Sequence, residues 1–178
     1  YIDRKRIFGL FAEDDLERTE FEPNLLEMLD FSIRESKRLL ADGCKGFFIM
    51  AEGSKIDWAS HDNDYEYYLK EMQEFEKTVK KALNFAEENN DTLVIVAADH
   101  ETGGLLIEQD DARYRETGNM KISWNTAVGR GVHTGIMVPV FAQGPGAENF
   151  SGVMDNTDVF FAMEEALGID SLEAYQCN

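Results

Sequence analysis

The stretch DTLVIVAADHETGG, residues 91–104, indicates the fold class of this chain. It begins with a run of small and branched apolar residues, which is typical of a strand buried on both faces of a sheet. The run ends in Asp99 and His100, polar side chains whose burial without a partner costs free energy. Ligands bind in open α/β sheets at the carboxyl ends of strands. We therefore expect Asp99 and His100 to face a ligand-binding crevice.

The segments before this strand predict an alternation of strands and helices. Apolar runs predict strands at 7–11 and 46–52. A helix is predicted to begin at Pro23 and to end at Gly43, and a second amphipathic helix is predicted at 65–89. The order β-α-β-α-β predicts a parallel sheet with right-handed crossovers.

The pattern is looser after the third strand. Residues 101–132 contain two short apolar segments separated by a polar stretch, which predicts a hairpin or a small excursion from the sheet. A further strand is predicted at 138–144 and a final helix at 158–168, where Gly168 provides the expected end.

Composition sets limits on the class of protein and its partners. The 178 residues are 43% hydrophobic, which fits one domain with its own core. Thirty-five acidic and 17 basic residues give a net charge of −18, which argues against nucleic acid as a partner. This charge still allows one phosphate group to be held through a metal ion. No apolar run approaches the roughly 18 residues that predict a membrane span.

Neither the cysteines nor the first residue indicates a cellular compartment. Cys44 and Cys177 lie far apart in the sequence, and we expect both to be free thiols. No signal peptide is present in the sequence. The first residue is Tyr1 rather than methionine, which predicts a processed or excised chain.

Polar residues follow several of the predicted strands. Glu52 ends the predicted strand 46–52, and Asp57 and His61 come four residues apart, a spacing that places both on one helix face. His133 lies between glycines just before the strand predicted to begin at residue 138. That strand must run antiparallel to the others if His133 is to reach the same crevice.

Together these loops contain all three histidines of the chain. The candidate metal ligands are Glu52, Asp57, His61, Asp99, His100 and His133. Six donors exceed what one tetrahedral zinc ion uses, so a cluster of two metal ions is predicted. Taken singly, each group also fits a structural role, as a turn residue, a helix-start pair or an Asx-turn. We expect Glu101 to orient His100.

Three motifs in this order resemble the alkaline phosphatase family. The pattern E-G-x-x-I-D-x-x-x-H occupies 52–61, T-L-V-I-V-x-A-D-H-E-T-G-G occupies 92–104, and H-T-G-x-x-V-P-V-x-A-x-G-P-G-A occupies 133–147. The segment DNTDVF at 155–160 is also similar to the end of the family's domain. The resemblance implies a three-layer α/β/α fold with a mostly parallel sheet. Residues 1–178 would form only its C-terminal part.

The resemblance also implies the ligand sets and the reaction. Asp57, His61 and His133 match the ligands of one zinc ion, Asp99 and His100 match ligands of a second zinc ion, and Glu52 matches a magnesium ligand. The implied reaction is hydrolysis of phosphate monoesters through a serine phosphoenzyme. A homodimer and a periplasmic or extracellular location are further implications.

The catalytic residues of the family's N-terminal half have no counterpart in this sequence. These are the nucleophilic serine, an acid that bridges the second zinc and the magnesium, a magnesium-binding threonine and a phosphate-binding arginine. We therefore expect no catalytic residue within this chain and no activity from the chain alone. The alternatives are a non-catalytic metal-binding or interaction module, or a related sulfatase, phosphodiesterase or phosphomutase reaction.

Overall fold

The structure is a computed structural model that describes residues 7–13, 15–17, 21–44, 46–109 and 120–168. The helices are α1 (Leu25–Ala41), α2 (Lys55–His61), α3 (Tyr65–Glu88), the short 3₁₀ helix η1 (Ala147–Phe150) and α5 (Asp158–Leu167). The strands are β1 (Val94–Ala97), β2 (Glu101–Thr102), β3 (Leu105–Gln109), β4 (Met120–Trp124), β5 (His133–Thr134) and β6 (Val140–Gln143). The predicted long helix and final helix are therefore confirmed as α3 and α5.

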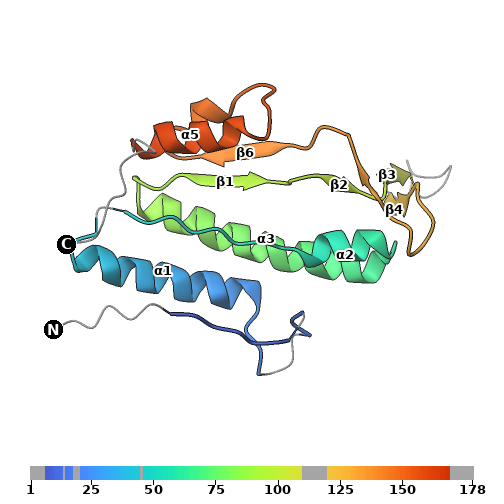
Figure 1. The fold of residues 1–178 in the computed structure, drawn as a ribbon, viewed down its shortest axis with the longest axis horizontal. Coiled ribbons are helices and arrows are strands. Elements are labelled where there is room, and N and C mark those ends of the chain that lie inside the picture. The colour runs from blue at the N-terminus through green and yellow to red at the C-terminus, as the bar shows by residue number, and fades with distance from the viewer. Residues whose placement is uncertain (1–6, 14, 18–20, 45, 110–119, 169–178) are drawn as a thin grey trace.

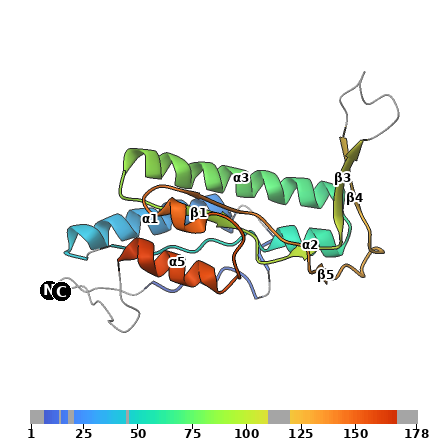
Figure 2. The ribbon, with the colours of Figure 1, turned by 90° about the horizontal axis from the view of Figure 1, so that it is seen from above.

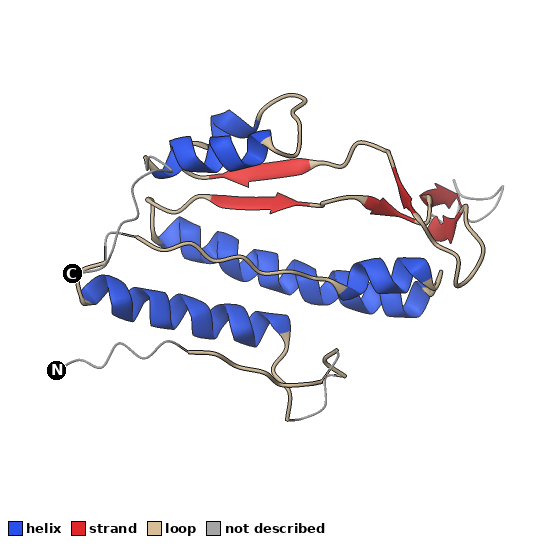
Figure 3. Ribbon diagram, in the orientation of Figure 1, coloured by secondary structure: helices blue, strands red, loops and turns tan. Residues whose placement is uncertain are grey.

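Helices cover both faces of the central strands. Figure 1 shows β1 and β6 side by side, and Figure 2 shows α3 and α5 on opposite sides of them. Helix α1 packs against α3, and η1 packs against β6 and α5. The α/β class and its three layers are thus confirmed, and Figure 3 shows where the helices and strands of the described residues lie. Among the described residues, no helix combines the length and apolarity needed to cross a membrane.

The β1–β6 ladder is antiparallel. Val94 lies opposite Gln143 and Ala97 lies opposite Val140. The end of β1 therefore lies beside the start of β6, and the segment from His133 approaches the same end of the sheet. This is the orientation that the sequence prediction for His133 requires.

The predicted parallel pairing is absent from the described residues, in which all three strand ladders are antiparallel. Segments 7–11 and 46–52 belong to no ladder there, although 46–52 runs in the same direction as β1. Phe47 packs against Phe85 of α3, with ring centroids 6.1 Å apart, whereas the Phe48 side chain is 62% exposed. An apolar run indicates a tendency to be buried, but it does not specify a hydrogen-bonding neighbour. The prediction of strands at 7–11 and 46–52 was wrong for this reason.

Helix α1 begins at Leu25, two residues after the predicted start at Pro23. Asn24 is the capping residue before the helix, and its side chain accepts a hydrogen bond from the Glu27 backbone amide at 2.9 Å. The Glu27 carboxylate in turn accepts one from the Asn24 amide at 2.9 Å. This reciprocal pair satisfies two amides that the first helical turn leaves without partners.

Replacing Asn24 with alanine is expected to lower the free energy of unfolding by about 1 kcal/mol, because one capping bond is lost. Chemical denaturation followed by circular dichroism measures this change. Ser54→Ala is the matched control, since Ser54 precedes α2 without forming a side-chain capping bond. Equal losses in the two variants would contradict the capping role of Asn24.

The buried core of the described residues is small. The apolar side chains that are buried are Leu29, Ile33, Ala59, Ala86, Phe150 and Ala162. Many large apolar side chains are exposed, among them Phe8 at 85% and Met50 at 81%. The core that the composition predicts is therefore small, and its buried apolar side chains lie on α1, α2, α3, η1 and α5.

The prediction of two free thiols was wrong for Cys44. Cys44 is disulfide-bonded. Cys177, the other cysteine of the sequence, lies outside the described residues. Sequence separation does not decide whether a cysteine forms a disulfide bond, because bond formation depends on the distance between sulfur atoms in the folded protein.

Candidate metal centre

Helix α2 presents an acid and an imidazole on the same face. Asp57 lies in its first turn and His61 is its last residue, so the two side chains are one turn apart. Asp57 Oδ2 lies 3.3 Å from His61 Nε2. The predicted helix spacing is therefore confirmed, and both donors face the same point.

The third donor comes from a distant strand. His133 begins β5, whose two residues pair with β2 so that Thr102 lies opposite His133. Helix α2 packs against β2. The short β2–β5 ladder thus brings His133 next to the face of α2 that carries Asp57 and His61.

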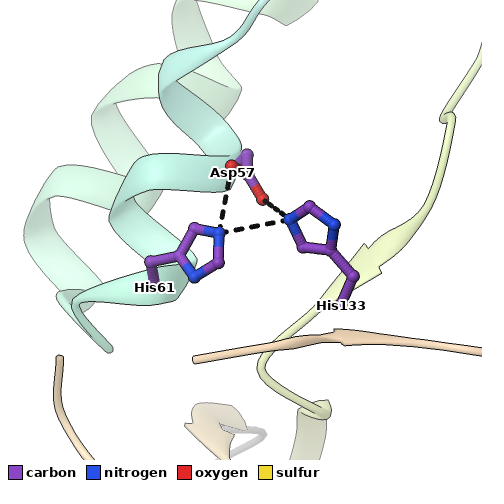
Figure 4. Close-up of side chains that lie close together, drawn as sticks. All are labelled: Asp57, His61 and His133. Atoms are coloured by element: carbon purple, nitrogen blue, oxygen red, sulfur yellow. Dashed lines mark hydrogen bonds and ion pairs between the residues drawn. The ribbon is translucent and has the colours of Figure 1, made fainter. Parts of the chain in front are cut away.

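The three side chains converge. His61 Nε2 and His133 Nε2 are 3.2 Å apart, and Asp57 Oδ1 lies 3.4 Å from His133 Nε2. Figure 4 shows the three side chains pointing toward one another. They form a group of His and acidic residues that could hold a metal ion. We call Asp57, His61 and His133 the triad.

A backbone hydrogen bond determines which nitrogen of His61 is available. His61 Nδ1 lies 2.7 Å from the Gly131 carbonyl oxygen, which can only accept a hydrogen bond. The proton therefore lies on Nδ1, and the lone pair of Nε2 points into the triad. Imidazole ligands of metal ions are commonly held in this way.

The spacing of the triad fits one zinc ion. With zinc–nitrogen bonds of about 2.0–2.1 Å, the ligand atoms of a tetrahedral site are about 3.3 Å apart. The His61 and His133 Nε2 atoms are 3.2 Å apart, and each lies near a different Asp57 oxygen, His61 at 3.3 Å from Oδ2 and His133 at 3.4 Å from Oδ1. Two imidazole nitrogens and a carboxylate also form a ligand set that zinc prefers. The residues present therefore fit the metal that the sequence resemblance implies.

The second predicted pair lies beside the triad. The His100 ring stacks on the His133 ring, with centroids 3.5 Å apart and an interplanar angle of 18°. His100 Nε2 lies 3.2 Å from Asp99 Oδ2, and the Asp99 side chain is 87% exposed. Glu52 is exposed and makes no hydrogen bond or ion pair within the described part of the chain. The structure thus brings five of the six predicted ligands to one region, and among the described residues no hydrogen bond or ion pair joins Glu52 to them.

Glu101 has a different role from the predicted one. Its carboxylate accepts hydrogen bonds from the Leu105 amide, at 2.7 Å, and from the Thr134 hydroxyl, so it does not orient His100. Successive side chains of an extended segment point to opposite sides, which turns Glu101 away from His100. The pKa of Tyr68 is raised above its usual value, mainly because the Tyr68 side chain is partly buried and secondly because of the negative charge of Glu101.

Three residues that hold the site together were missed at the sequence level. The Thr102 hydroxyl donates to Asp57 Oδ1, the Gly131 carbonyl accepts from His61, and the Asn63 side chain donates to the Thr126 carbonyl at 2.6 Å. Asn63 thereby ties the loop before His133 to the end of α2. Thr102 lies within a quoted motif, but the motif gives no indication of its partner.

The fold and the donor groups define an α/β protein with a candidate divalent-metal centre at one end of its central strands. The family model for alkaline phosphatase matches residues 3–121 and 107–169. The chain belongs to the alkaline phosphatase family.

Individual relatives agree with this assignment. Alkaline phosphatase 3 of Bacillus subtilis is 30% identical over 225 residues, which cover 86% of this chain and 47% of that protein. Streptomycin-6-phosphate phosphatase of Streptomyces griseus is 38% identical over 136 residues, covering 70% of this chain and 30% of that protein. The chain spans less than half the length of these relatives.

Solved structures show the same fold. Alkaline phosphatase from the Antarctic bacterium TAB5 superimposes with a TM-score of 0.70 at 33% identity, covering 81% of this chain and 41% of that one. A variant of that enzyme with magnesium bound also has a TM-score of 0.70, at 32% identity and covering 83% of this chain and 42% of that one.

Proposed function

We propose that this chain supplies most of the zinc ligands of an enzyme that hydrolyses phosphate monoesters. The observation that carries the proposal is the triad, in which Asp57, His61 and His133 converge at distances that suit one zinc ion. Zinc bound there would act as a Lewis acid toward phosphoryl oxygens.

The residues of the chain would hold the ion in a defined orientation. The Gly131 carbonyl keeps the His61 Nε2 lone pair directed into the triad, and the Thr102 hydroxyl holds one Asp57 oxygen. Asp99 and His100 would bind a second zinc ion beside the first, and Glu52 a magnesium ion. The magnesium-bound TAB5 variant supports the presence of magnesium in proteins with this fold.

The nucleophile is proposed to come from the part of the domain that this chain does not contain. The chain spans 47% of alkaline phosphatase 3 of Bacillus subtilis, and the implied serine belongs to the remaining half. We therefore propose that the 178-residue chain binds zinc but does not turn over substrate. In the complete enzyme, the serine would take the phosphoryl group from the ester and release the alcohol, and water would then hydrolyse the phosphoserine to free serine and phosphate.

Hydrolysis of p-nitrophenyl phosphate tests the proposal. The 178-residue chain and the complete gene product are each assayed with zinc and magnesium, beside a sulfate ester and a phosphodiester. We expect hydrolysis of the phosphate monoester by the complete gene product and none by the chain alone.

Other outcomes distinguish the alternatives. Preference for the sulfate ester or the diester would identify a related hydrolase reaction instead. Zinc binding without hydrolysis of any ester by the complete gene product would identify a non-catalytic metal-binding module. Activity of the 178-residue chain alone would contradict the proposed origin of the nucleophile.

We also propose export to the periplasm or the extracellular space. The disulfide bond of Cys44 supports this location, because disulfides persist in oxidising compartments. The predicted homodimer remains a prediction, and sedimentation of the purified protein measures it.

A further inference from the structure

The Thr102 hydroxyl lies between the two candidate ligand sets. Thr102 is buried, at 7% exposure, in β2 opposite His133. Its Oγ1 donates a hydrogen bond to Asp57 Oδ1 of the triad. The same oxygen lies 3.2 Å from His100 Nδ1. One side chain thus touches a member of each set.

A hydroxyl group has only one proton, and this determines the direction of both hydrogen bonds. The ionised Asp57 carboxylate can only accept, so the Thr102 proton points to Asp57. Toward His100, the hydroxyl then offers a lone pair, and His100 Nδ1 must carry the proton of that bond. The two hydrogen bonds therefore form a relay, in which His100 Nδ1–H donates to Thr102 Oγ1 and Thr102 Oγ1–H donates to Asp57 Oδ1.

This direction leaves the other nitrogen of His100 for a ligand. With the proton on Nδ1, the lone pair of Nε2 faces Asp99 Oδ2 at 3.2 Å. A nitrogen lone pair and a carboxylate repel one another at this distance unless a cation lies between them. With His100 protonated on Nδ1, His100 Nε2 and Asp99 Oδ2 both present lone pairs that a cation could bind.

We propose that Thr102 is a positioning residue that couples the two ligand sets by orienting Asp57 and fixing His100 with its proton on Nδ1. This inference rests on the proposed zinc function for its effect on affinity, but its effect on the tautomer does not require a metal. Mutation of a group that hydrogen-bonds to a metal ligand typically lowers metal affinity by about 10- to 100-fold. Because Thr102 acts on both sets at once, its loss should weaken both.

Two measurements on the 178-residue chain test the proposal. Long-range ¹H–¹⁵N correlation spectra of the metal-free chain identify which imidazole nitrogen carries the proton, and only three histidines contribute signals. Single His→Ala variants assign these signals. Titration with zinc alone, against a competing chelator, measures the affinity.

The variants distinguish the effect of the Thr102 hydroxyl from the effect of the volume of its side chain. Thr102→Val keeps the shape, and we expect it to lose the Nδ1–H preference of His100 and to lower zinc affinity about tenfold. Thr102→Ser restores the hydroxyl and should restore both properties. Thr78→Val is the matched control, because Thr78 is also buried but its hydroxyl donates to the Glu74 carbonyl within α3.

Each result supports or overturns the inference. A wild-type His100 with its proton on Nε2 would overturn the relay, even if Thr102→Val failed to fold. Unchanged tautomer and zinc affinity in Thr102→Val would also overturn it. A wild-type chain that binds no zinc would overturn the proposed metal centre and the coupling of affinities, whereas the tautomer measurement would still decide the role of Thr102 toward His100.

Discussion

The variant His133→Ala is expected to bind zinc at least about a hundredfold more weakly than the wild-type chain, which exceeds the effect typical of groups that only orient a ligand. One of the three converging donors is removed, and no other histidine of the chain can take its place without leaving its own position. The His133 side chain is 49% exposed, so its truncation leaves no buried cavity. The loss of affinity should therefore occur without a comparable loss of folding stability.

A second pair of variants provides the control for this prediction. Asp57→Asn removes the negative charge from the triad and should also weaken zinc binding. Asp62→Asn removes an exposed acid that lies at the end of the same helix, outside the triad, and should leave zinc affinity near the wild-type value. Zinc titration against a chelator and thermal melts measure both properties. Equal affinity in His133→Ala and the wild type would contradict the ligand assignment.

Gly131→Ala is expected to have the next largest effect. A Cβ atom at Gly131 would lie 2.7 Å from His61 Cα and 3.2 Å from His61 Nδ1. Because the closest atom belongs to the backbone, the loop must move away from α2. Such overpacking typically costs about 1–3 kcal/mol of folding stability.

The same movement should disturb the metal centre. It would lengthen the hydrogen bond between His61 and the Gly131 carbonyl and shift the segment that leads to His133. We therefore expect a fall in zinc affinity of about 10- to 100-fold in Gly131→Ala, as for other groups that orient a ligand.

Gly135→Ala tests whether this effect is specific. Gly135 lies two residues after His133, and a Cβ atom added there would meet nothing within 4 Å. The control should therefore retain both stability and zinc affinity, as measured by denaturation and by zinc titration. A Gly131→Ala variant that behaves like Gly135→Ala would contradict the close approach of the loop to His61.

The sequence predicted those features that depend on nearby residues. The apolar stripe predicted helix 65–89, and the structure has α3 at Tyr65–Glu88. The four-residue spacing of Asp57 and His61 correctly predicted that they share a helix face. Glycine at position 168 correctly predicted the end of α5, where it has a φ of 60°. Each of these properties follows from helix geometry within a few residues.

The sequence predictions failed where they depended on a partner. The apolar segments 7–11 and 46–52 were assigned to a parallel sheet, but among the described residues β1 pairs only with β6. Glu101 was assigned to His100, but its carboxylate is bonded to Leu105 and Thr134. In both cases the residue type was informative, but it did not identify the partner with which the residue interacts.

By itself, the sequence determined the order of the helices, the position of β1 and the chemical types of the candidate ligands. Only the tertiary structure decided that His61 and His133, 72 residues apart, have their Nε2 atoms 3.2 Å from each other. It also decided that the Thr102 hydroxyl lies between Asp57 and His100. The physical reason is that helical and strand periodicity encode which face of a segment is apolar. The contact between two distant faces depends instead on the packing and hydrogen bonding of the whole chain.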